Sequence, residues 1–360
     1  MEGINHEEGG RSNQAACLNR ERHHAIIERK AAMSGEDVWA LILAGGEGTR
    51  LSSLTTTPGG LTVPKQFCSL HGGMSLVEET LSRAAVMAPR RRMLAVVAGR
   101  HRRWWEAPLW SLPPLNIIVQ PENKGTAVGL LLPLLHLAQR NPTATVVVLP
   151  ADHFVRDEAV LAQSLQHAAR LAHADHQHVY LLGLVPERID PELGYIVPEG
   201  RTRLGVSHVR RFFEKPAFDI ASRLIDTGAL WNVFILAASV RALLGLYTKR
   251  FPDLIARMTA AVEQDGLRTH DALGAERLYS GLPTVDFSRD VLEGQEAALR
   301  VLSVPACGWS DLGTPQRVAE TLSGYRDRRE PAPIVHHAAY LSLADQHSRQ
   351  QLSNCAPAHS

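Results

Sequence analysis

The stretch LILAGGEGTRLSSLTTTPGGLTVPKQF, residues 41–67, decides how the rest of the chain is interpreted. A short apolar run leads into Gly45, Gly46 and Gly48. An arginine and, further along, a lysine after a proline follow these glycines. Glycines let backbone N–H groups approach a polyanion closely, which indicates a phosphate-binding loop. It is neither a P-loop, because no lysine follows Gly48, nor a dinucleotide fingerprint, because a leucine stands where the third glycine belongs.

The bulk composition of the 360 residues is that of a soluble globular protein, with 45% apolar and 21% charged residues. The formal charge of +1 gives no reason to expect a nucleic-acid partner. None of the four cysteines forms a C-x-x-C pair, so we expect reduced thiols and a cytoplasmic location. The longest apolar run, residues 128–138, is too short to span a bilayer, so we expect no membrane contact. The sequence leaves a homodimer open.

The middle of the chain, residues 38–326, reads as one domain between two polar tails. Continuous Val/Ile/Leu runs alternate with amphipathic helical patterns in its first half, which indicates strands that are buried on both faces. The pattern predicts an α/β fold with a doubly wound, mainly parallel but mixed sheet, whose ligands lie beyond the carboxyl ends of the strands. Residues 1–37 are expected to be disordered and residues 327–360 to be weakly structured.

A series of segments carries a resemblance to a known family: LAGGEGTRL, PKQF, QPENKGTAVG, LPADHFV, ELGYIVP, VRRFFEKP, LWNVFILA and GWSDLGTP. In this order they resemble the sugar-1-phosphate nucleotidyltransferases, and PKQF is most similar to the mannose-1-phosphate guanylyltransferases. The resemblance implies a Rossmann-like, GT-A-like fold and a Mg²⁺-dependent reaction of GTP with mannose 1-phosphate that gives GDP-mannose and pyrophosphate. It divides the domain into a nucleotide half, residues 38–185, and a sugar-phosphate half, residues 186–326.

The resemblance implies a set of nucleotide contacts in the first half. They are Leu43, Ala44, Gly45, Gly46, Gly48, Thr49, Gln120, Gly125 and Thr126. A glutamine amide can bond a base edge in two directions, and a glycine lets backbone approach the base. The alternative is an ordinary strand-to-helix loop in which Thr126 caps the helix. The expectation of guanine rests on the resemblance, because these residues do not select a base by their chemistry.

The resemblance further implies that Arg50, Lys65 and Asp152 are catalytic and that Asp152 and Asp311 are the metal ligands. Asp152 follows an apolar run, and Asp311 lies at a second strand-to-helix turn. Two converging carboxylates suit Mg²⁺, which prefers oxygen ligands. Each aspartate could instead cap the helix that follows it. His153 could line the same opening or bond backbone in a turn.

The implied sugar-phosphate contacts are Gly194, Glu214, Lys215 and Asn232. Lysine supplies a point charge for a phosphate, and a glutamate can accept hydrogen bonds from sugar hydroxyls. The alternative is a solvated strand end before Pro216. Asp286 is a further candidate, which could also cap the next helix.

Three segments depart from the family pattern: the loop between Leu51 and Pro64 is longer, NKGTAVG lacks the usual Arg-Asn pair and proline, and WNVF lacks the small Ser-Gly pair. These departures concern the choice of base and sugar more than the reaction type. Two alternatives therefore stay open. One is a sister enzyme that uses glucose 1-phosphate and another triphosphate, and the other is a non-catalytic sugar-nucleotide-binding regulator.

Overall fold

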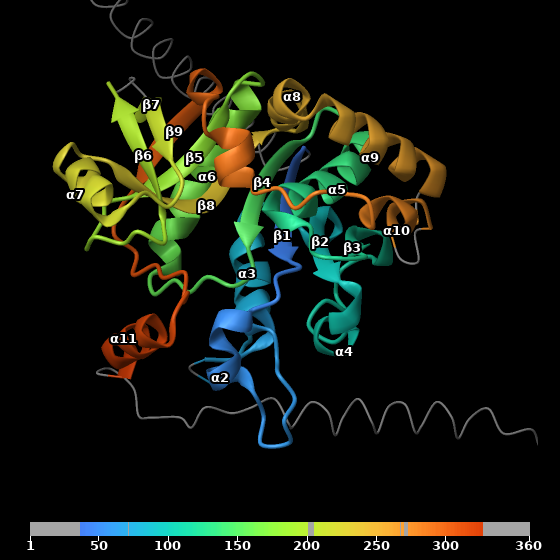
Figure 1. The fold of residues 1–360 in the computed structure, drawn as a ribbon, viewed down its shortest axis with the longest axis horizontal. Coiled ribbons are helices and arrows are strands. Elements are labelled where there is room, and N and C mark those ends of the chain that lie inside the picture. The colour runs from blue at the N-terminus through green and yellow to red at the C-terminus, as the bar shows by residue number, and fades with distance from the viewer. Residues whose placement is uncertain (1–36, 71, 201–204, 267, 270–272, 327–360) are drawn as a thin grey trace, which may run out of the picture.

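The computed structural model describes residues 37–326, apart from residues 71, 201–204, 267 and 270–272. The two predicted tails lie outside these residues, except for Asp37. In the part of the chain that is described, nine strands form one sheet in the order β3-β2-β1-β4-β8-β5-β9-β7-β6 (Figure 1). No helix in the same part of the chain has both the length and the apolar character that crossing a membrane requires.

The parallel part of the sheet comes from the first half of the domain. It consists of β1 (Val38–Ala44), β2 (Met93–Ala98), β3 (Ile117–Gln120) and β4 (Thr145–Pro150). Every residue of β2 and β4 is buried, as expected for strands that are covered on both faces. Along β1, Leu41 packs into one apolar core and Ile42 into the other, because successive side chains point to opposite faces.

The rest of the sheet is mixed. It contains β5 (Val179–Leu184), β6 (Gly194–Glu199), β7 (Val206–Phe213), β8 (Leu230–Ser239) and β9 (Leu299–Val304). β5 and β9 pair in parallel, whereas β8 is antiparallel to β4, β5 and β6, and β7 is antiparallel to β6 and β9. The expected parallel pattern is therefore continuous only across β3-β2-β1-β4. The apolar run of β8 is buried almost throughout, so its composition did not reveal that it runs against its neighbours.

Helices pack on both faces of the sheet. One core contains residues of α5 (Gly125–Arg140), α8 (Val240–Arg250), α9 (Pro252–Asp265) and α10 (Leu273–Tyr279), and the other contains residues of α3 (Leu76–Ala84) and α6 (Glu158–Ala174). α7 (Phe218–Asp226) packs on β6, and α11 (Pro315–Arg326) lies far from α9 and α10 (Figure 1). The shorter turns are η1 (Thr49–Leu51), α2 (Ser52–Thr55), η2 (Lys65–Phe67), η3 (Arg90–Arg92), η4 (Gly99–His101), α4 (Arg102–Trp105), η5 (Pro114–Asn116), η6 (Phe287–Leu292) and η7 (Glu296–Ala298).

Candidate active site

Two adjoining cavities, of about 440 and 410 Å³, open where β1, β3 and β4 end. Their volumes lie in the range of small-molecule sites, and the carboxyl ends of parallel strands are where such folds bind ligands. Both cavities are lined by Arg50, Asn123, Asp152, His153 and Asp311. A ligand that extends from one cavity into the other would therefore pass these five side chains.

Nearly all of the predicted site residues line these cavities. The larger cavity contains Leu43, Gly45, Gly46, Gln120, Gly125, Thr126, Gly194, Glu214, Lys215 and Asn232, the smaller contains Gly48, Thr49 and Lys65, and both contain Arg50, Asp152 and Asp311. Ala44 is the exception, and its carbonyl accepts a hydrogen bond of 2.8 Å from Gln66 Nε2. The fold thus brings together residues that are more than 250 positions apart in the sequence.

The glycines of the loop after β1 are required for different structural reasons. Gly48 has a left-handed backbone, with φ of 65°, and an added Cβ would lie 2.7 Å from the backbone nitrogen of Lys65. A Cβ on Gly45 would meet the Gln120 amide at 2.4 Å. At Gly46, by contrast, no atom of the described residues lies within 4 Å of the Cβ position, apart from Gly46 itself and its two chain neighbours. Packing explains Gly48 and Gly45, whereas the space at Gly46 faces the cavity and is free for a ligand.

Lys65 connects the two predicted metal ligands. Its side chain is only 7% exposed, its Nζ lies 2.8 Å from Asp152 Oδ2, and it donates to the backbone oxygen of Asp311 at 2.6 Å. Desolvation opposes the ionisation of Asp152, but the Lys65 ammonium outweighs it and holds the pKa of this carboxyl below its ordinary value. Asp152 is therefore ionised at neutral pH, and 41% of its side chain is exposed.

Asp311 is held by a buried arginine, Arg317 of α11. Arg317 Nη1 donates to Asp311 Oδ1 at 2.5 Å, and Nη2 donates to Asp190 Oδ1 at 2.7 Å. Desolvation opposes the ionisation of Asp311, but the guanidinium of Arg317 outweighs it and lowers the pKa. Because Asp190 lies in the loop that leads into β6, Arg317 ties the turn that carries Asp311 to this loop.

The predicted alternative that these aspartates cap helices is wrong. α6 is capped by Asp157, whose Oδ1 accepts from the backbone nitrogen of Val160. At α11, the hydroxyl of Thr314 accepts from the backbone nitrogen of Arg317. Asp152 and Asp311 are therefore not needed to start either helix, and both line the cavities instead.

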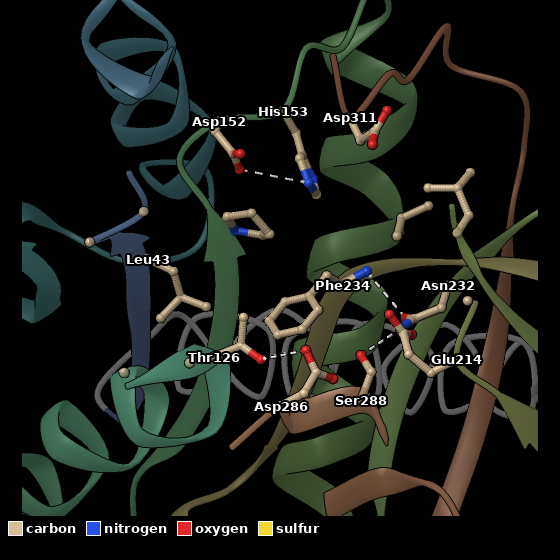
Figure 2. A pocket seen from close by; sticks show the side chains of 18 of the residues that line it. Leu43, Thr126, Asp152, His153, Glu214, Asn232, Phe234, Asp286, Ser288 and Asp311 are labelled. Carbon is tan, nitrogen blue, oxygen red and sulfur yellow. Dashed lines mark hydrogen bonds and ion pairs between the residues drawn. The ribbon is translucent and has the colours of Figure 1, made fainter. Parts of the chain in front are cut away.

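His153 lies between the two aspartates (Figure 2). Burial lowers the pKa of His153 to about 4, so the ring is neutral. Trp309 Nε1 donates to its Nδ1 at 3.3 Å, which assigns the ring proton to Nε2, 3.8 Å from Asp152 Oδ1. His153 was expected either to line the opening or to bond backbone in a turn, and in the structure it lines both cavities.

The donor set at Asp152 and Asp311 fits Mg²⁺. In the described ranges, no group of three or more His, Cys, Asp or Glu side chains is arranged to hold a metal ion. Two carboxylates with room for substrate oxygens match Mg²⁺, which keeps waters or phosphates in its shell. They do not match a structural zinc site, which needs four nitrogen or sulfur ligands.

Residues 186–326, the half predicted to bind the sugar phosphate, contribute a second group of polar side chains (Figure 2). Burial, with a contribution from Asp286, raises the pKa of Glu214 to about 7, and the hydroxyl of Ser288 bonds its carboxyl group. Gly194 lies against this group, because a Cβ there would come within 2.7 Å of Glu214 Oε2. Asn232 Nδ2 donates to Ser288 Oγ at 3.3 Å. These residues form a compact polar cluster on one wall of the larger cavity.

Asp286 and Thr126 join the two halves. Thr126 Oγ1 donates to Asp286 Oδ2 at 3.3 Å and accepts from the backbone nitrogen of Phe287 at 2.7 Å. Asp286 also caps η6, since its Oδ1 accepts from the backbone nitrogen of Arg289. The Asp286 side chain therefore lines the larger cavity and caps η6 at the same time.

Three cavity residues show a strained backbone. Lys215, Phe234 and Leu312 have φ of 50°, 54° and 48°, and they are the non-glycine residues with positive φ in the described chain. All three line one of the cavities. Such conformations cost about 1–3 kcal/mol each and concentrate at functional sites. This backbone strain, which no sequence pattern shows, supports the assignment of the site.

Sequence reasoning missed several lining residues, of which the main ones are Gln66, Asn123, Glu192, Phe234, Ser288 and the supporting Arg317. Gln66, Asn123, Glu192 and Phe234 all stand inside quoted motifs, so these motifs held a signal for them. Glu192 lies 3.5 Å from Arg50, and both side chains are more than half exposed. The sequence did not identify Arg317 as a supporting residue, because a single arginine on an amphipathic helix cannot be distinguished from an ordinary solvent-exposed charge.

The comparisons with known proteins agree with this geometry. The family model described as "Nucleotidyl transferase" matches residues 39–328. The chain belongs to the nucleotidyl transferase family. This confirms the resemblance that the motifs predicted.

Among curated relatives of this nucleotidyl transferase, the xanthan biosynthesis protein XanB of Xanthomonas campestris (strain B100) is 30% identical over 77% of this chain and 58% of its own length. Mannose-1-phosphate guanylyltransferase 2 of Escherichia coli O157:H7 is 28% identical over 79% of this chain and 60% of its own length. The chain thus spans about three fifths of the length of these relatives.

Among solved structures, one described as a mannose-1-phosphate geranyltransferase from Thermus thermophilus has a TM-score of 0.68 and 25% identity. It covers 80% of this chain and 79% of that one. A UDP-glucose pyrophosphorylase has a TM-score of 0.52 at 16% identity, covering 81% of this chain and 100% of that one, which supports the fold alone. These neighbours assign the chain to the Rossmann-like nucleotidyltransferase fold.

Proposed function

We propose that the protein transfers a guanylyl group from GTP to mannose 1-phosphate, giving GDP-mannose and pyrophosphate. The observation that carries this proposal is the continuity of the two cavities in a nucleotidyl transferase. The glycine loop and Gln120 come from the ends of β1 and β3, Glu214 and Lys215 follow β7, and all of them border these cavities. The mannose-1-phosphate guanylyltransferases among the relatives support the choice of sugar and base.

The proposed reaction is a single displacement at the α-phosphorus of the triphosphate. A phosphate oxygen of the sugar substrate forms a bond to this phosphorus, while the bond to the bridging oxygen of the β-phosphate breaks and pyrophosphate leaves. The nucleophile is already an anion, so no strong base is required. The protein has instead to hold two polyanions together and to stabilise the charge that develops between them.

We assign charge stabilisation to Lys65 and Arg50. Lys65 is buried and fixed by Asp152 and the carbonyl of Asp311, so its ammonium is positioned before substrate binds. Arg50 is 59% exposed and only loosely paired with Glu192 at 3.5 Å, so it is free to pair with phosphate oxygens instead. Asp152 and Asp311 would hold Mg²⁺, which would neutralise phosphate charge and orient the triphosphate.

The nucleobase is assigned to the pocket beside Gln120. This side chain is 3% exposed, and its Nε2 donates to the carbonyl of Gly45 at 3.3 Å. Gln120 and Gly129 both line the larger cavity, and Gln120 Oε1 would lie 3.3 Å from a Cβ on Gly129; we propose that this oxygen accepts from a base N–H. Gly125 opens α5 with a left-handed backbone, and its amide is bonded to Asn123 Oδ1.

The sugar phosphate is assigned to the wall formed by Gly194, Glu214, Lys215 and Asn232. Lys215 Nζ lies 3.9 Å from Glu214 Oε1 and is 35% exposed, so it can turn toward a phosphate. Substrates of this kind are small molecules, and no nucleic-acid partner is proposed. The cytoplasmic location and the homodimer stay predictions.

A substrate matrix tests the proposal. Purified protein is incubated with Mg²⁺, each of the common nucleoside triphosphates, and mannose or glucose 1-phosphate, and pyrophosphate release is measured. We expect the highest kcat/KM for GTP with mannose 1-phosphate. A preference for glucose 1-phosphate with another triphosphate would favour the sister enzyme. Turnover with no pair would favour the non-catalytic regulator.

Two variants test the metal assignment. Asp311→Ala should nearly abolish pyrophosphate release while the thermal melting curve shows a folded protein. Asp157→Ala, which removes the cap of α6 and lines neither cavity, is the control for loss of an aspartate. If Asp311→Ala retained synthesis at the wild-type level, the assignment of Asp311 to the metal would be wrong.

A further inference from the structure

Phe234 has a backbone that its side chain does not favour. It lies on β8 with φ of 54°, a region that bulky residues rarely adopt. The pairing of β8 with β5 is irregular at this point, because Leu181 pairs with Leu236 but Gly183 pairs with Asn232. β8 therefore bulges around Phe234, and bulges of this kind redirect a side chain next to an active site.

The bulge directs Phe234 toward the larger cavity. The ring is half-buried, lines this cavity, and lies between Thr126 and Asn232 in Figure 2. Its inner side meets Phe287 in an edge-to-face contact, with 5.8 Å between ring centroids. Phe287 is fully buried and fixes the ring from behind. Residues of both predicted halves, among them Thr126 and Asn232, line the same cavity as this ring.

The neighbours of the ring on this wall are polar. The backbone N–H of Phe234 donates to Asn232 Oδ1 at 3.1 Å, and Asn232 Nδ2 donates to Ser288 Oγ, whose hydroxyl also bonds the Glu214 carboxyl group. A hexose has hydroxyls around its edge and C–H groups on its faces. Polar side chains match the edge, and an aromatic ring beside them matches a C–H face.

Packing alone does not account for phenylalanine here. A glycine would adopt φ of 54° without strain and would leave Asn232 Oδ1 the same backbone partner. The core behind the ring is already filled by Phe287 and by Tyr247, which packs on Phe287. The strained phenylalanine therefore contributes chiefly on the cavity side.

We propose that Phe234 determines specificity in the sugar subsite, an inference that rests on the proposed function. The ring packs on a C–H face of the hexose of the sugar 1-phosphate. It offers no hydrogen bond, so an epimer that directs a hydroxyl at the ring loses a hydrogen bond to water without replacement. Discrimination of this kind is worth about ten- to two-hundredfold in kcat/KM.

The test uses the full chain and the variants Phe234→Gly, Phe234→Ala and Phe234→Leu. KM and kcat are measured for the sugar 1-phosphate that the wild type prefers, for its C2 epimer, and for the triphosphate. Phe234→Gly removes the ring and accepts the left-handed backbone. It should raise KM for the preferred sugar phosphate about tenfold, lower the preference over the epimer at least tenfold, and leave KM for the triphosphate unchanged.

The other variants separate the effect of the aromatic ring on kinetics from effects on the stability of the fold. Phe234→Ala removes the ring but keeps the strain, so it should match Phe234→Gly in kinetics and melt at a lower temperature. Phe234→Leu keeps apolar bulk without a flat face, so its preference should lie between wild type and Phe234→Gly. Phe218→Ala, which removes an exposed phenylalanine of α7, should behave as wild type.

The outcomes are distinguishable from those of the substrate matrix. If the wild type turns over no substrate pair, the proposed function fails. If the wild type is active and all three Phe234 variants keep its KM and its epimer preference, the role of Phe234 is wrong while the proposed function stands. Equal rises in KM for sugar phosphate and triphosphate would also overturn it, because they would indicate a general disturbance of the cavity.

Discussion

The two sides of the larger cavity are built differently. On the side that we propose for the nucleotide, parallel strands end in glycine loops, and the lining is largely backbone, as at Gly45, Gly46 and Gly125. On the side that we propose for the sugar phosphate, antiparallel strands present side chains, among them Glu214 with a raised pKa and Phe234 with a strained backbone. A triphosphate is recognised by amides and charge, whereas one hexose among its epimers has to be selected by shaped side chains.

The largest expected effect is at Lys65, which lines the smaller cavity next to the side proposed for the nucleotide. Lys65→Met removes the fixed ammonium at the reacting phosphates and should lower kcat by about a hundred- to a thousandfold. Pyrophosphate release under saturating substrates measures it. Lys249→Met, on an exposed position of α8 that lines neither cavity, is the matched control. A loss below tenfold would show that the positioned lysine is not the main charge at the transition state.

Arg317 joins the two sides, so its removal should weaken the fold itself. Arg317→Met leaves the carboxylates of Asp190 and Asp311 without their buried partner, which costs about 3–5 kcal/mol of unfolding free energy. Urea unfolding measures the change. Arg223→Met breaks an exposed pair with Asp219 and should cost at most about 1 kcal/mol. Equal midpoints for the two variants would contradict the buried bridge.

A substitution at Gly46 should change KM for the triphosphate without changing KM for the sugar phosphate. Gly46→Ala adds a methyl group where no atom of the described residues lies within 4 Å, apart from Gly46 itself and its two chain neighbours, so the melting temperature should change little. The methyl group would displace a phosphate from the backbone, where each hydrogen bond to a charged group contributes about 1.5–3 kcal/mol. KM for the triphosphate should therefore rise about tenfold or more, with KM for the sugar phosphate unchanged. A rise in the second KM instead would place the sugar phosphate on the glycine loop.

The smallest expected effect is at Glu214, where the free energy of unfolding should depend on pH. Its pKa of about 7 in the folded protein lies above the ordinary 4.5, so the folded state binds the proton more tightly than the unfolded chain does. The stability that this protonation contributes is complete below about pH 4.5 and is lost as the pH rises through 7. Glu214→Gln should remove that slope from the free energy of unfolding.

The same group should affect sugar binding in the opposite direction. The ionised carboxylate accepts hydrogen bonds from hydroxyls, so KM for the sugar phosphate should fall several-fold between about pH 6 and 8. The substrate phosphate also loses a proton near pH 6, and that part of the profile remains in Glu214→Gln. Parallel profiles for wild type and variant would exclude Glu214 from sugar recognition.

The sequence was most informative where short-range chemistry forces a pattern. The run that ends at Ala44 could only be a buried strand, and Gly48 needs its left-handed backbone to pass Lys65. The order of the motifs supplied the family, and nearly every residue that it implied for the site lines one of the two cavities. It did not supply the direction of β8, because a strand buried on both faces has the same apolar composition in either direction.

The tertiary structure decided what depends on residues that are distant in the chain. It excluded the helix-cap interpretation of Asp152 and Asp311, because only the folded chain shows that Asp157 and Thr314 supply those caps. It raised the pKa of Glu214 through burial beside Asp286, and it set Phe234 in a bulge that no motif announces. The sequence by itself determined the family and the residues proposed to carry the reaction, because phosphate chemistry needs particular residue types. The shape of the proposed sugar subsite arises from long-range packing, which a linear pattern does not encode.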